Sequence, residues 1–306
     1  MSETIYELLN THQIRKTKAQ KAAFLQWLTP LAIKHGYAVT TEKGPCGAKN
    51  IILGDPDHAN VVFTAHYDTC AVMPFPNFIT PKCVPLYLLY QVVITLVIFI
   101  VAGTVSLAAA AIHPVLAPLM YGAVLLALIL LMICGPANKH TANDNTSGVV
   151  TVLETARTLP ENLRDRVCFV LFDLEEAGLI GSASYRKTHL QATNKQLILN
   201  LDCVGDGDVL RMFPTKALRA DRVKLTSLYK ACGYFGNKNI LLHEKGFSVY
   251  PSDQKNFPYG VGIAALKKGK FGLYLDKIHT KKDTVLEETN VNILRAALTS
   301  FICCDS

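Results

Sequence analysis

The sequence predicts an α/β fold in which a mixed, mostly parallel sheet is sandwiched by helices and carries an inserted transmembrane helical hairpin. Short apolar runs of strand length alternate with segments of helical periodicity, which is the order of elements in a layered α/β domain. Acidic and histidine residues stand where several of these runs end, and this is where an α/β sheet presents its chemistry. A central segment, from Cys83 to Asn138, contains no Asp, Glu, Lys or Arg.

The elements before the central segment begin with an amphipathic helix, expected over roughly 18–35. Three strands follow it, near 37–41, 50–53 and 60–65. The last of these strands delivers His66 at its end.

The elements after the central segment begin with the polar loop 143–148. Behind it, Val149, Val152, Leu153 and Ala156 follow helical spacing. The remaining strands and helices then alternate: strands near 167–172, 197–201, 209–213 and 261–266, helices near 183–189 and 221–231, and a last helix from Asn290. Such an alternation predicts helices on both faces of one sheet.

Five acidic and imidazole groups stand in five separate stretches, at strand ends or in polar loops. A hydrolytic site for two metal ions needs ligands of these types, with one carboxylate shared between the ions and another free to take a proton from water. The five candidate metal ligands are His66, Asp144, Glu176, Asp202 and His279. An enzyme is therefore the leading hypothesis.

Two further carboxylates are candidate catalytic residues. Glu175 precedes Glu176, and adjacent residues at a strand end point in different directions, so one can bind a metal while its neighbour acts as a base. Asp68 follows His66 by two residues. We expect the Asp68 carboxylate to accept a hydrogen bond from the far ring nitrogen of His66 and so fix its tautomer.

At these residues the chain resembles the co-catalytic dizinc aminopeptidases, metallopeptidase family twenty-eight, over most of its length outside the central segment. Residues 66–68 are similar to the family's His-x-Asp, and 143–148 to its Asp-Asp/Asn-x-Ala/Ser-Gly loop. Residues 175–176 resemble its Glu-Glu, 200–202 the stretch that carries a ligand Asp, and 278–284 its His-Thr-x-x-Asp-Thr.

The resemblance implies a zinc aminopeptidase-like, phosphorylase/hydrolase-like fold that binds two Zn²⁺ ions, or other divalent ions. It makes Asp144 the bridging ligand, with a cis peptide bond to Asn145, and Glu175 the general base. The other ligands that it implies are His66 and Asp202 for one ion, and Glu176 and His279 for the second.

Two positions depart from the family's pattern. Gln254, in the segment 252–257, stands where a His is common, and Ile278 stands where some members place a Tyr before the last ligand His. Side-chain specificity and the group that polarises the scissile carbonyl are therefore left unassigned.

The charge-free segment predicts two membrane spans. Residues 84–112 and 115–134 would run about 43 Å and about 30 Å as helices, and a bilayer core is about 30 Å thick. The alternative is a buried helical hairpin in a soluble protein, but core helices rarely stay apolar on every face for this length. The small residues Ala102, Ser106 and Ala110 predict a packing stripe between the two helices.

An even number of spans returns the chain to one side, so residues 1–82 and 139–306 can form a single catalytic domain around the hairpin 83–138. Basic residues flank the spans and the hairpin tip has none, which places this domain in the cytoplasm of an integral membrane protein. Lys82, Lys139 and His140 flank the spans, and the segment before them also carries Arg15, Lys16, Lys18 and Lys21. An odd count of nine cysteines and the absence of a secretory signal agree with a reducing compartment.

The function expected from the sequence is a membrane-anchored, metal-dependent exopeptidase, most simply a dizinc aminopeptidase acting on peptides. The alternatives are a glutaminyl-cyclase-like transferase, a metallocarboxypeptidase with a cation from 211–224, and a non-catalytic, receptor-like membrane protein. The expected partners are a peptide substrate and the lipid bilayer. Despite a formal charge of +7, nucleic acid is not expected, because no sustained basic run with interleaved aromatic residues is present. The oligomeric state is not predicted.

Overall fold

The computed structural model describes residues 2–232, 240–242, 248–270 and 272–304. Their strands form one sheet in the order β1-β2-β4-β3-β5-β8-β6-β7, with β9 paired to β8. The strands are β1 (Val39–Lys43), β2 (Lys49–Leu53), β3 (Val61–His66), β4 (Val167–Phe172), β5 (Leu197–Leu201), β6 (Val209–Pro214), β7 (Ile240–Leu242), β8 (Gly260–Gly269) and β9 (Gly272–Tyr274). The predicted mixed sheet is confirmed, although β7 and β9 were not expected from the sequence.

The four central strands, β4, β3, β5 and β8, are parallel to one another, and the antiparallel pairs lie toward the edges. The residues of β3, β4 and β5 are all buried. Burial on both faces explains why these strands read as continuous apolar runs rather than as alternating patterns.

The described residues form ten α-helices. They are α1 (Glu3–Asn10), α2 (Lys18–Lys34), α3 (Val84–Ala110), α4 (Leu116–Cys134), α5 (Gly148–Thr158), α6 (Ile180–Thr188), α7 (Leu190–Thr193), α8 (Lys216–Ala220), α9 (Arg222–Cys232) and α10 (Glu288–Cys304). Short helical turns lie at η1 (Pro45–Gly47), η2 (Ala142–Ser147), η3 (Glu161–Arg166) and η4 (Asp253–Asn256). Helix α2 begins where predicted because Thr17 and Gln20 form a reciprocal capping box.

Helices cover both faces of the sheet. On one face α1, α2, α5, α9 and α10 contribute to the main apolar core, which contains Phe24 of α2, Phe63 of β3 and Leu298 of α10. The opposite face carries a smaller core with Tyr185 of α6 and Phe257. This arrangement confirms the predicted α/β sandwich.

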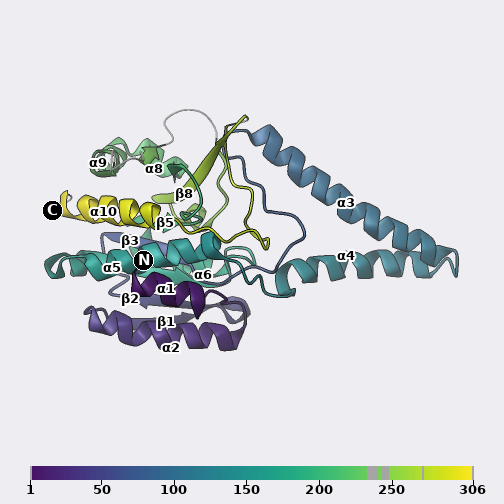
Figure 1. The fold of residues 1–306 in the computed structure, drawn as a ribbon, viewed down its shortest axis with the longest axis horizontal. Helices are drawn as coiled ribbons and strands as arrows, with labels where there is room; N and C mark the ends of the chain where they lie inside the picture. Colours follow the sequence, from purple (N-terminus) through teal and green to yellow (C-terminus); the bar gives the residue numbers. More distant parts are fainter. Residues whose placement is uncertain (1, 233–239, 243–247, 271, 305–306) are drawn as a thin grey trace.

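Helices α3 and α4 extend away from the α/β body as a hairpin (Figure 1). In the most apolar 18-residue window of each helix, only 11% of the α3 window and none of the α4 window is buried. A core hairpin of a soluble protein would be mostly buried, so this one presents its apolar side chains outward. Ala102 is buried, and the Ser106 hydroxyl donates a hydrogen bond of 2.8 Å to the carbonyl of Ala117 in α4.

Residues 70–83 before α3 and 135–138 after α4 form the two stems of the hairpin, which bond to each other through main-chain contacts. Ala71 and Ala137 form an isolated β-bridge, and the Val72 amide donates to the Pro136 carbonyl at 2.9 Å. The Lys16 ammonium donates to the Ile133 carbonyl at the end of α4, at 2.7 Å. These contacts begin only a few residues after β3 ends, so the hairpin starts at the carboxyl edge of the sheet.

Candidate metal centre

Three adjacent parallel strands bring the predicted site residues to one edge of the sheet. Strand β3 ends at His66, β4 is followed by Glu175 and Glu176, and β5 is followed directly by Asp202. Because β3 lies between β4 and β5 in the sheet, residues far apart in sequence meet at the carboxyl ends of these strands.

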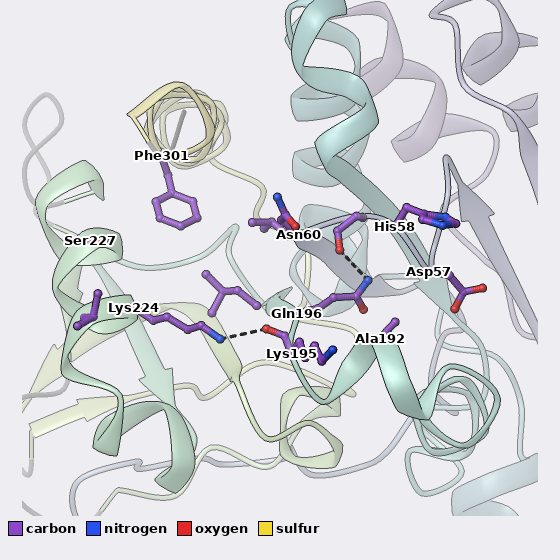
Figure 2. Close-up of a pocket in the computed structure, with 13 residues that line it drawn as sticks. Asp57, His58, Asn60, Ala192, Lys195, Gln196, Lys224, Ser227 and Phe301 are labelled. Carbon is purple, nitrogen blue, oxygen red and sulfur yellow. Dashed lines mark hydrogen bonds between the residues drawn. The ribbon is translucent and has the colours of Figure 1, made fainter.

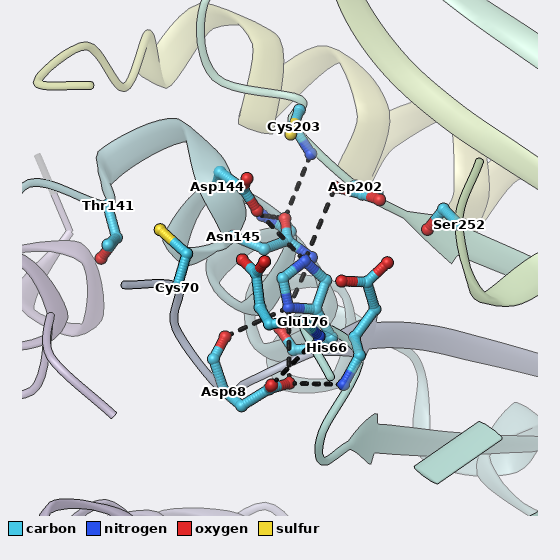
Figure 3. A network of polar contacts seen from close by, with 12 residues as sticks. His66, Asp68, Cys70, Thr141, Asp144, Asn145, Glu176, Asp202, Cys203 and Ser252 are labelled. Atoms are coloured by element: carbon cyan, nitrogen blue, oxygen red, sulfur yellow. Dashed lines mark hydrogen bonds and ion pairs between the residues drawn. The ribbon is translucent and has the colours of Figure 1, made fainter. Parts of the chain in front are cut away.

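The loops before α5 and before α10 add Asp144 and His279 to this cluster. One carboxylate oxygen of Asp144, Oδ1, lies 3.2 Å from His66 Nε2, and the other, Oδ2, lies 3.1 Å from His279 Nε2. Asp202 Oδ1 lies 3.7 Å from His66 Nε2, and Glu176 Oε2 lies 3.2 Å from His279 Nε2. The structure therefore brings all five predicted ligands together, with Asp144 between two histidines. Figure 3 shows His66, Asp144, Glu176 and Asp202 of this cluster.

The donor types suit zinc. The ligand atoms of His66, Asp144 and Asp202 all lie within 4.8 Å of one another. Imidazole nitrogen and carboxylate oxygen are ordinary zinc ligands in catalytic sites. Glu176 Oε1 is buried, and no described residue provides it with a hydrogen-bond partner. An unpaired buried carboxylate oxygen is costly unless a cation lies beside it.

The cluster has a strongly negative potential. Burial by itself lowers the pKa of His66, but the charge of Glu175 and hydrogen bonds to Asp144 and Asp202 raise it well above 6.5. Burial likewise lowers the pKa of His279, and Glu176 and Asp144 raise it well above the same value. Carboxylates that hold a proton on these imidazoles would also hold a divalent cation.

Glu175 and Glu176 differ in their surroundings. Burial raises the pKa of Glu175 well above 4.5; the nearby His66 opposes this shift and Glu176 adds to it. Glu176 pairs with His279. Glu175 lies near His66, because the potential ligand atoms of His66, Glu175 and Glu176 are all within 4.8 Å of one another. One glutamate of the pair thus contacts the second histidine, while its neighbour is left as the candidate base.

Asp68 has a different geometry from the one expected. His66 Nδ1 lies 3.1 Å from the main-chain carbonyl of Asp68, closer than the 3.6 Å to its carboxylate. The carboxylate instead accepts hydrogen bonds from the main-chain amides of Glu175 and Glu176, at 3.1 and 3.3 Å. Asp68 is therefore a positioning residue for the glutamate pair as well as for His66.

The Asp144 loop, expected to be a polar loop that leads into a helix, is an irregular turn directly before α5: Asp144 and Asn145 have non-helical φ and ψ angles and are joined by a cis peptide bond, as the resemblance implies. The Asn145 amide holds it, accepting from the Cys203 amide at 3.2 Å and donating to the Leu201 carbonyl at 2.9 Å. Asp283 accepts from the Asp144 amide at 3.0 Å. Burial raises the pKa of Asp283 to about 7, and the Asp144 charge adds to this shift.

Three residues at the centre adopt positive φ. Leu174 (54°) precedes the glutamate pair, Cys203 (57°) follows Asp202, and His279 itself has φ 65°. Each such conformation costs a non-glycine residue about 1–3 kcal/mol and tends to occur at functional sites. No local sequence pattern signals these conformations.

From the sequence, Arg15 was counted among the basic residues that place the domain in the cytoplasm, but its side chain is completely buried. Its Nε donates to the Tyr67 carbonyl at 2.6 Å, and its guanidinium also reaches Thr146 Oγ1 at 3.2 Å. Lys21, from the same charged segment, pairs with Asp173. Both cations thus support loops of the metal centre, which a count of charges cannot show.

The segment 252–257 lies next to the centre, and Gln254, although almost completely buried, is among the residues that line a separate cavity of about 270 Å³ beside Tyr250 and Lys255. Gln254 is 2% exposed and donates to the Tyr250 carbonyl at 3.0 Å. Asp253 is also buried, with a short hydrogen bond from Ser182, and burial raises its pKa to about 7. Ile278 packs in an apolar cluster and offers no polar group to a substrate carbonyl.

A cavity of about 390 Å³ lies elsewhere, at the amino ends of β3 and β5 (Figure 2). The residues that line it include Lys195, Lys224 and Phe301. The Lys224 ammonium donates to the Lys195 carbonyl at 3.0 Å. Because chemistry in such sheets lies at the carboxyl ends of the strands, we assign the reaction to the metal centre rather than to this cavity.

Comparison with protein families gives one match, the model "Peptidase family M28", over residues 126–300. The matched region is more than half of the chain. It contains Asp144, Glu175, Glu176, Asp202 and His279, whereas His66 lies before it. A comparison with curated protein sequences gives no match.

Solved structures share the fold at low identity. Glutaminyl cyclase from Porphyromonas gingivalis is 16% identical, with a TM-score of 0.62 and coverage of 99% of this chain and 96% of that one. A Zn-dependent exopeptidase from Parabacteroides distasonis is 15% identical, with a TM-score of 0.60 and coverage of 98% and 95%. The LapA aminopeptidase of Legionella pneumophila is 15% identical, with a TM-score of 0.59 and coverage of 99% and 70%.

Proposed function

Since this chain belongs to peptidase family M28, we propose that it is a membrane-anchored, metal-dependent exopeptidase, and more specifically a dizinc aminopeptidase. The observation that carries the dizinc assignment is the position of Asp144. Its two carboxylate oxygens face two different histidines, at 3.2 and 3.1 Å. A carboxylate shared in this way is what a two-metal site requires.

Each ion would have its own set of ligands besides the bridge. His66 and Asp202 would hold the first ion, and Glu176 and His279 the second, as their proximity supports. Zinc bound there would supply Lewis-acid chemistry, polarising the scissile carbonyl and making the attacking water more acidic.

Glu175 is the proposed general base. Its carboxylate takes a proton from the attacking water and returns it to the leaving amine, so the pKa of Glu175 must allow both transfers. Burial raises the pKa of Glu175, which makes its carboxylate a stronger base. Asp68 holds the main chain of the glutamate pair, which keeps the base in reach of the reacting atoms.

An aminopeptidase suits the surroundings better than a carboxypeptidase does. The centre is dominated by carboxylates, which attract the α-ammonium of a peptide and repel a terminal carboxylate. Arg211, among the cations considered for a carboxypeptidase, lies buried in β6. The proposed substrate is therefore a peptide with a free amino terminus.

The hairpin is the proposed membrane anchor. Its outward apolar surface would be unfavourable in water, and α3 and α4 are long enough and apolar enough to cross a bilayer. Because both stems leave the body at the edge that carries the metal centre, this anchoring would place the active site near the bilayer surface. The flanking Lys82 and Lys139 favour a cytoplasmic catalytic domain.

Zinc content measured together with two activities tests the proposal. Purified in detergent, the protein should contain about two zinc ions per chain. It should release the first residue of peptides that have a free amino terminus and leave amino-blocked peptides intact. One zinc per chain, together with cyclisation of amino-terminal glutamine, would instead favour a glutaminyl-cyclase-like transferase. Absence of bound metal and of both activities would favour a receptor-like protein.

A further inference from the structure

Cys70 lies inside the metal centre, where the sequence had not pointed to any thiol. The potential ligand atoms of Cys70, Glu176 and His279 all lie within 4.8 Å of one another. Tetrahedral bonds of about 2.0–2.3 Å to one zinc ion put its ligand atoms roughly 3.3–3.8 Å apart, which lies inside this limit. Figure 3 shows the Cys70 side chain beside the Glu176 carboxylate. Only 3% of Cys70 is exposed.

The stems of the hairpin hold this cysteine in place. The Asn138 amide donates to the Cys70 carbonyl at 3.1 Å, and the Asn138 side chain lies 3.9 Å from the Cys70 sulfur. The same side chain donates to the Thr280 carbonyl at 3.0 Å. The Met73 amide donates to the His279 carbonyl at 2.8 Å. Cys70 and His279 are therefore on main-chain segments that are bonded to each other.

A second observation points to a cation at this position. Glu176 Oε2 faces His279, whereas Glu176 Oε1 is buried and has no hydrogen-bond partner among the described residues. A buried, ionised carboxylate oxygen in this state is unfavourable unless a cation lies nearby. The thiol sulfur, an imidazole nitrogen and one carboxylate oxygen of Glu176 form a single compact group.

We propose that the Cys70 thiolate is an additional ligand of the second metal ion, beside Glu176, His279 and the bridging Asp144. This inference rests on the proposed metallopeptidase function. When the ion binds, the thiol proton leaves to solvent and the sulfur donates an electron pair to the ion, with no change of oxidation state.

The two ions then differ in the number of their protein ligands. The second has four, whereas the first has three: His66, Asp202 and the bridging carboxylate. Zinc sites with four protein ligands are structural, and sites with three keep a position open for water or substrate. The second ion would thus anchor the centre, and the first would exchange more readily. A sulfur ligand also favours soft ions such as zinc over magnesium and manganese.

Cobalt substitution tests the proposal without relying on activity. Wild-type protein loaded with two equivalents of Co²⁺ should show a near-ultraviolet sulfur-to-cobalt charge-transfer band. Cys70→Ser should lose this band, and Cys203→Ser, which removes another buried thiol beside the centre, should keep it. X-ray absorption of the wild-type zinc form should show a zinc–sulfur distance of about 2.3 Å, so the test holds even if Cys70→Ser does not fold.

Dialysis against a chelator tests the asymmetry of the two ions. Wild type should lose one zinc ion quickly and keep the other, whereas Cys70→Ser should bind the retained ion at least about tenfold more weakly. Two bound ions without a zinc–sulfur or cobalt–sulfur signal would overturn the role of Cys70 and leave the peptidase proposal standing. A protein that binds no metal would overturn both.

Discussion

Asp144 faces two histidines because the turn that carries it, η2 before α5, is held by hydrogen bonds of Asn145 and Asp283. At the scale of single residues, the sequence and the family resemblance indicated the groups of the site and their expected roles, but not the hydrogen bonds that position them. Asp68 was expected to orient His66 through its carboxylate, and that carboxylate instead accepts the amides of Glu175 and Glu176. Adjacent main-chain amides at a strand end are better placed for it than the ring nitrogen.

Replacing Glu175 separates metal binding from chemistry. Glu175→Gln keeps the shape of the side chain but removes the base, so turnover should fall about 10²–10⁴-fold while zinc content stays at two per chain. Metal analysis and peptidase assays of the same preparation measure both. Glu161→Gln, at a carboxylate whose side chain is 88% exposed, is the control and should change neither. Near-normal turnover of Glu175→Gln would show that Glu175 is not the general base.

At the scale of elements, local sequence signals predicted where helices and strands lie, and packing against neighbouring elements set the residues at which they begin and end. Helix α2 begins at its capping box, as predicted, whereas α6 begins at Ile180, three residues earlier than expected. Gly181 explains the earlier start, because a Cβ at this position would lie 2.2 Å from the Asp173 carbonyl. Only a glycine lets the first turn of α6 approach the end of β4 so closely.

Gly148 at the start of α5 should be intolerant of a side chain. Alanine normally favours a helix over glycine by about 1 kcal/mol. Here its Cβ would lie 2.3 Å from both Asn145 Oδ1 and the Leu201 carbonyl, two groups that hold the Asp144 loop. We expect Gly148→Ala to be destabilising by about 1–3 kcal/mol and to weaken zinc binding.

Thermal unfolding in detergent and metal titration measure these effects. Gly103→Ala in α3, where no heavy atom lies within 4 Å of the added Cβ, is the matched control: it should leave zinc binding unchanged and should not lower the melting temperature, because alanine favours a helix over glycine. Wild-type zinc affinity in Gly148→Ala would contradict the proposed dependence of the metal centre on this close approach.

His189 connects the end of α6 with β1 and with the loop between β2 and β3 through two ion pairs. At the end of α6, its ring nitrogens lie 2.7 Å from Asp57 and 2.5 Å from Glu42 of β1. Burial lowers its pKa, but hydrogen bonds to the two carboxylates outweigh burial and raise it above 6.5. The stabilisation is therefore complete below the unfolded-state pKa of 6.5 and is lost as pH rises through the higher folded-state value.

His189→Gln should consequently lower the melting temperature more at about pH 6 than at about pH 9. His58→Gln, which breaks an exposed pair with Asp55, is the control and should have little effect at either pH. An equal loss at the two pH values in His189→Gln would show that the imidazole acts through packing rather than through its charge.

At the scale of the whole molecule, the hairpin and the metal centre share one edge of the sheet, with α3 and α4 leading away from the body (Figure 1). Counting basic residues gave an orientation for the hairpin, but Arg15 and Lys21 contribute to the protein interior rather than to a membrane-facing surface. Cysteine labelling in intact cells tests the orientation directly.

A membrane-impermeant maleimide should label His113→Cys at the hairpin tip from outside. The native Cys46, exposed on the body, should react only after the membrane is permeabilised. Labelling of Cys46 in intact cells would show that the catalytic domain lies outside the cell, and it would leave the proposed chemistry unchanged. Recovery of the unmodified protein in the soluble fraction without detergent would contradict the proposal that the hairpin is a membrane anchor.

The sequence by itself determined the sheet, the ligand types and the hairpin. These are read from local features: continuous apolar runs for buried parallel strands, polar residues at the ends of those runs, and a long segment without charge. The expected bounds of β4 and β5 agree with the structure because both strands are buried over their whole length.

Only the tertiary structure decided how these parts cooperate. The hydrogen bonds that hold Asp144, the role of Asp68 and the inward position of Arg15 depend on contacts between residues far apart in the chain. The place of Cys70 beside Glu176 and His279 depends on the hairpin stems in the same way. Local propensity acts over a few residues, whereas the charge, burial and spacing of a metal centre are set by segments that meet only after folding.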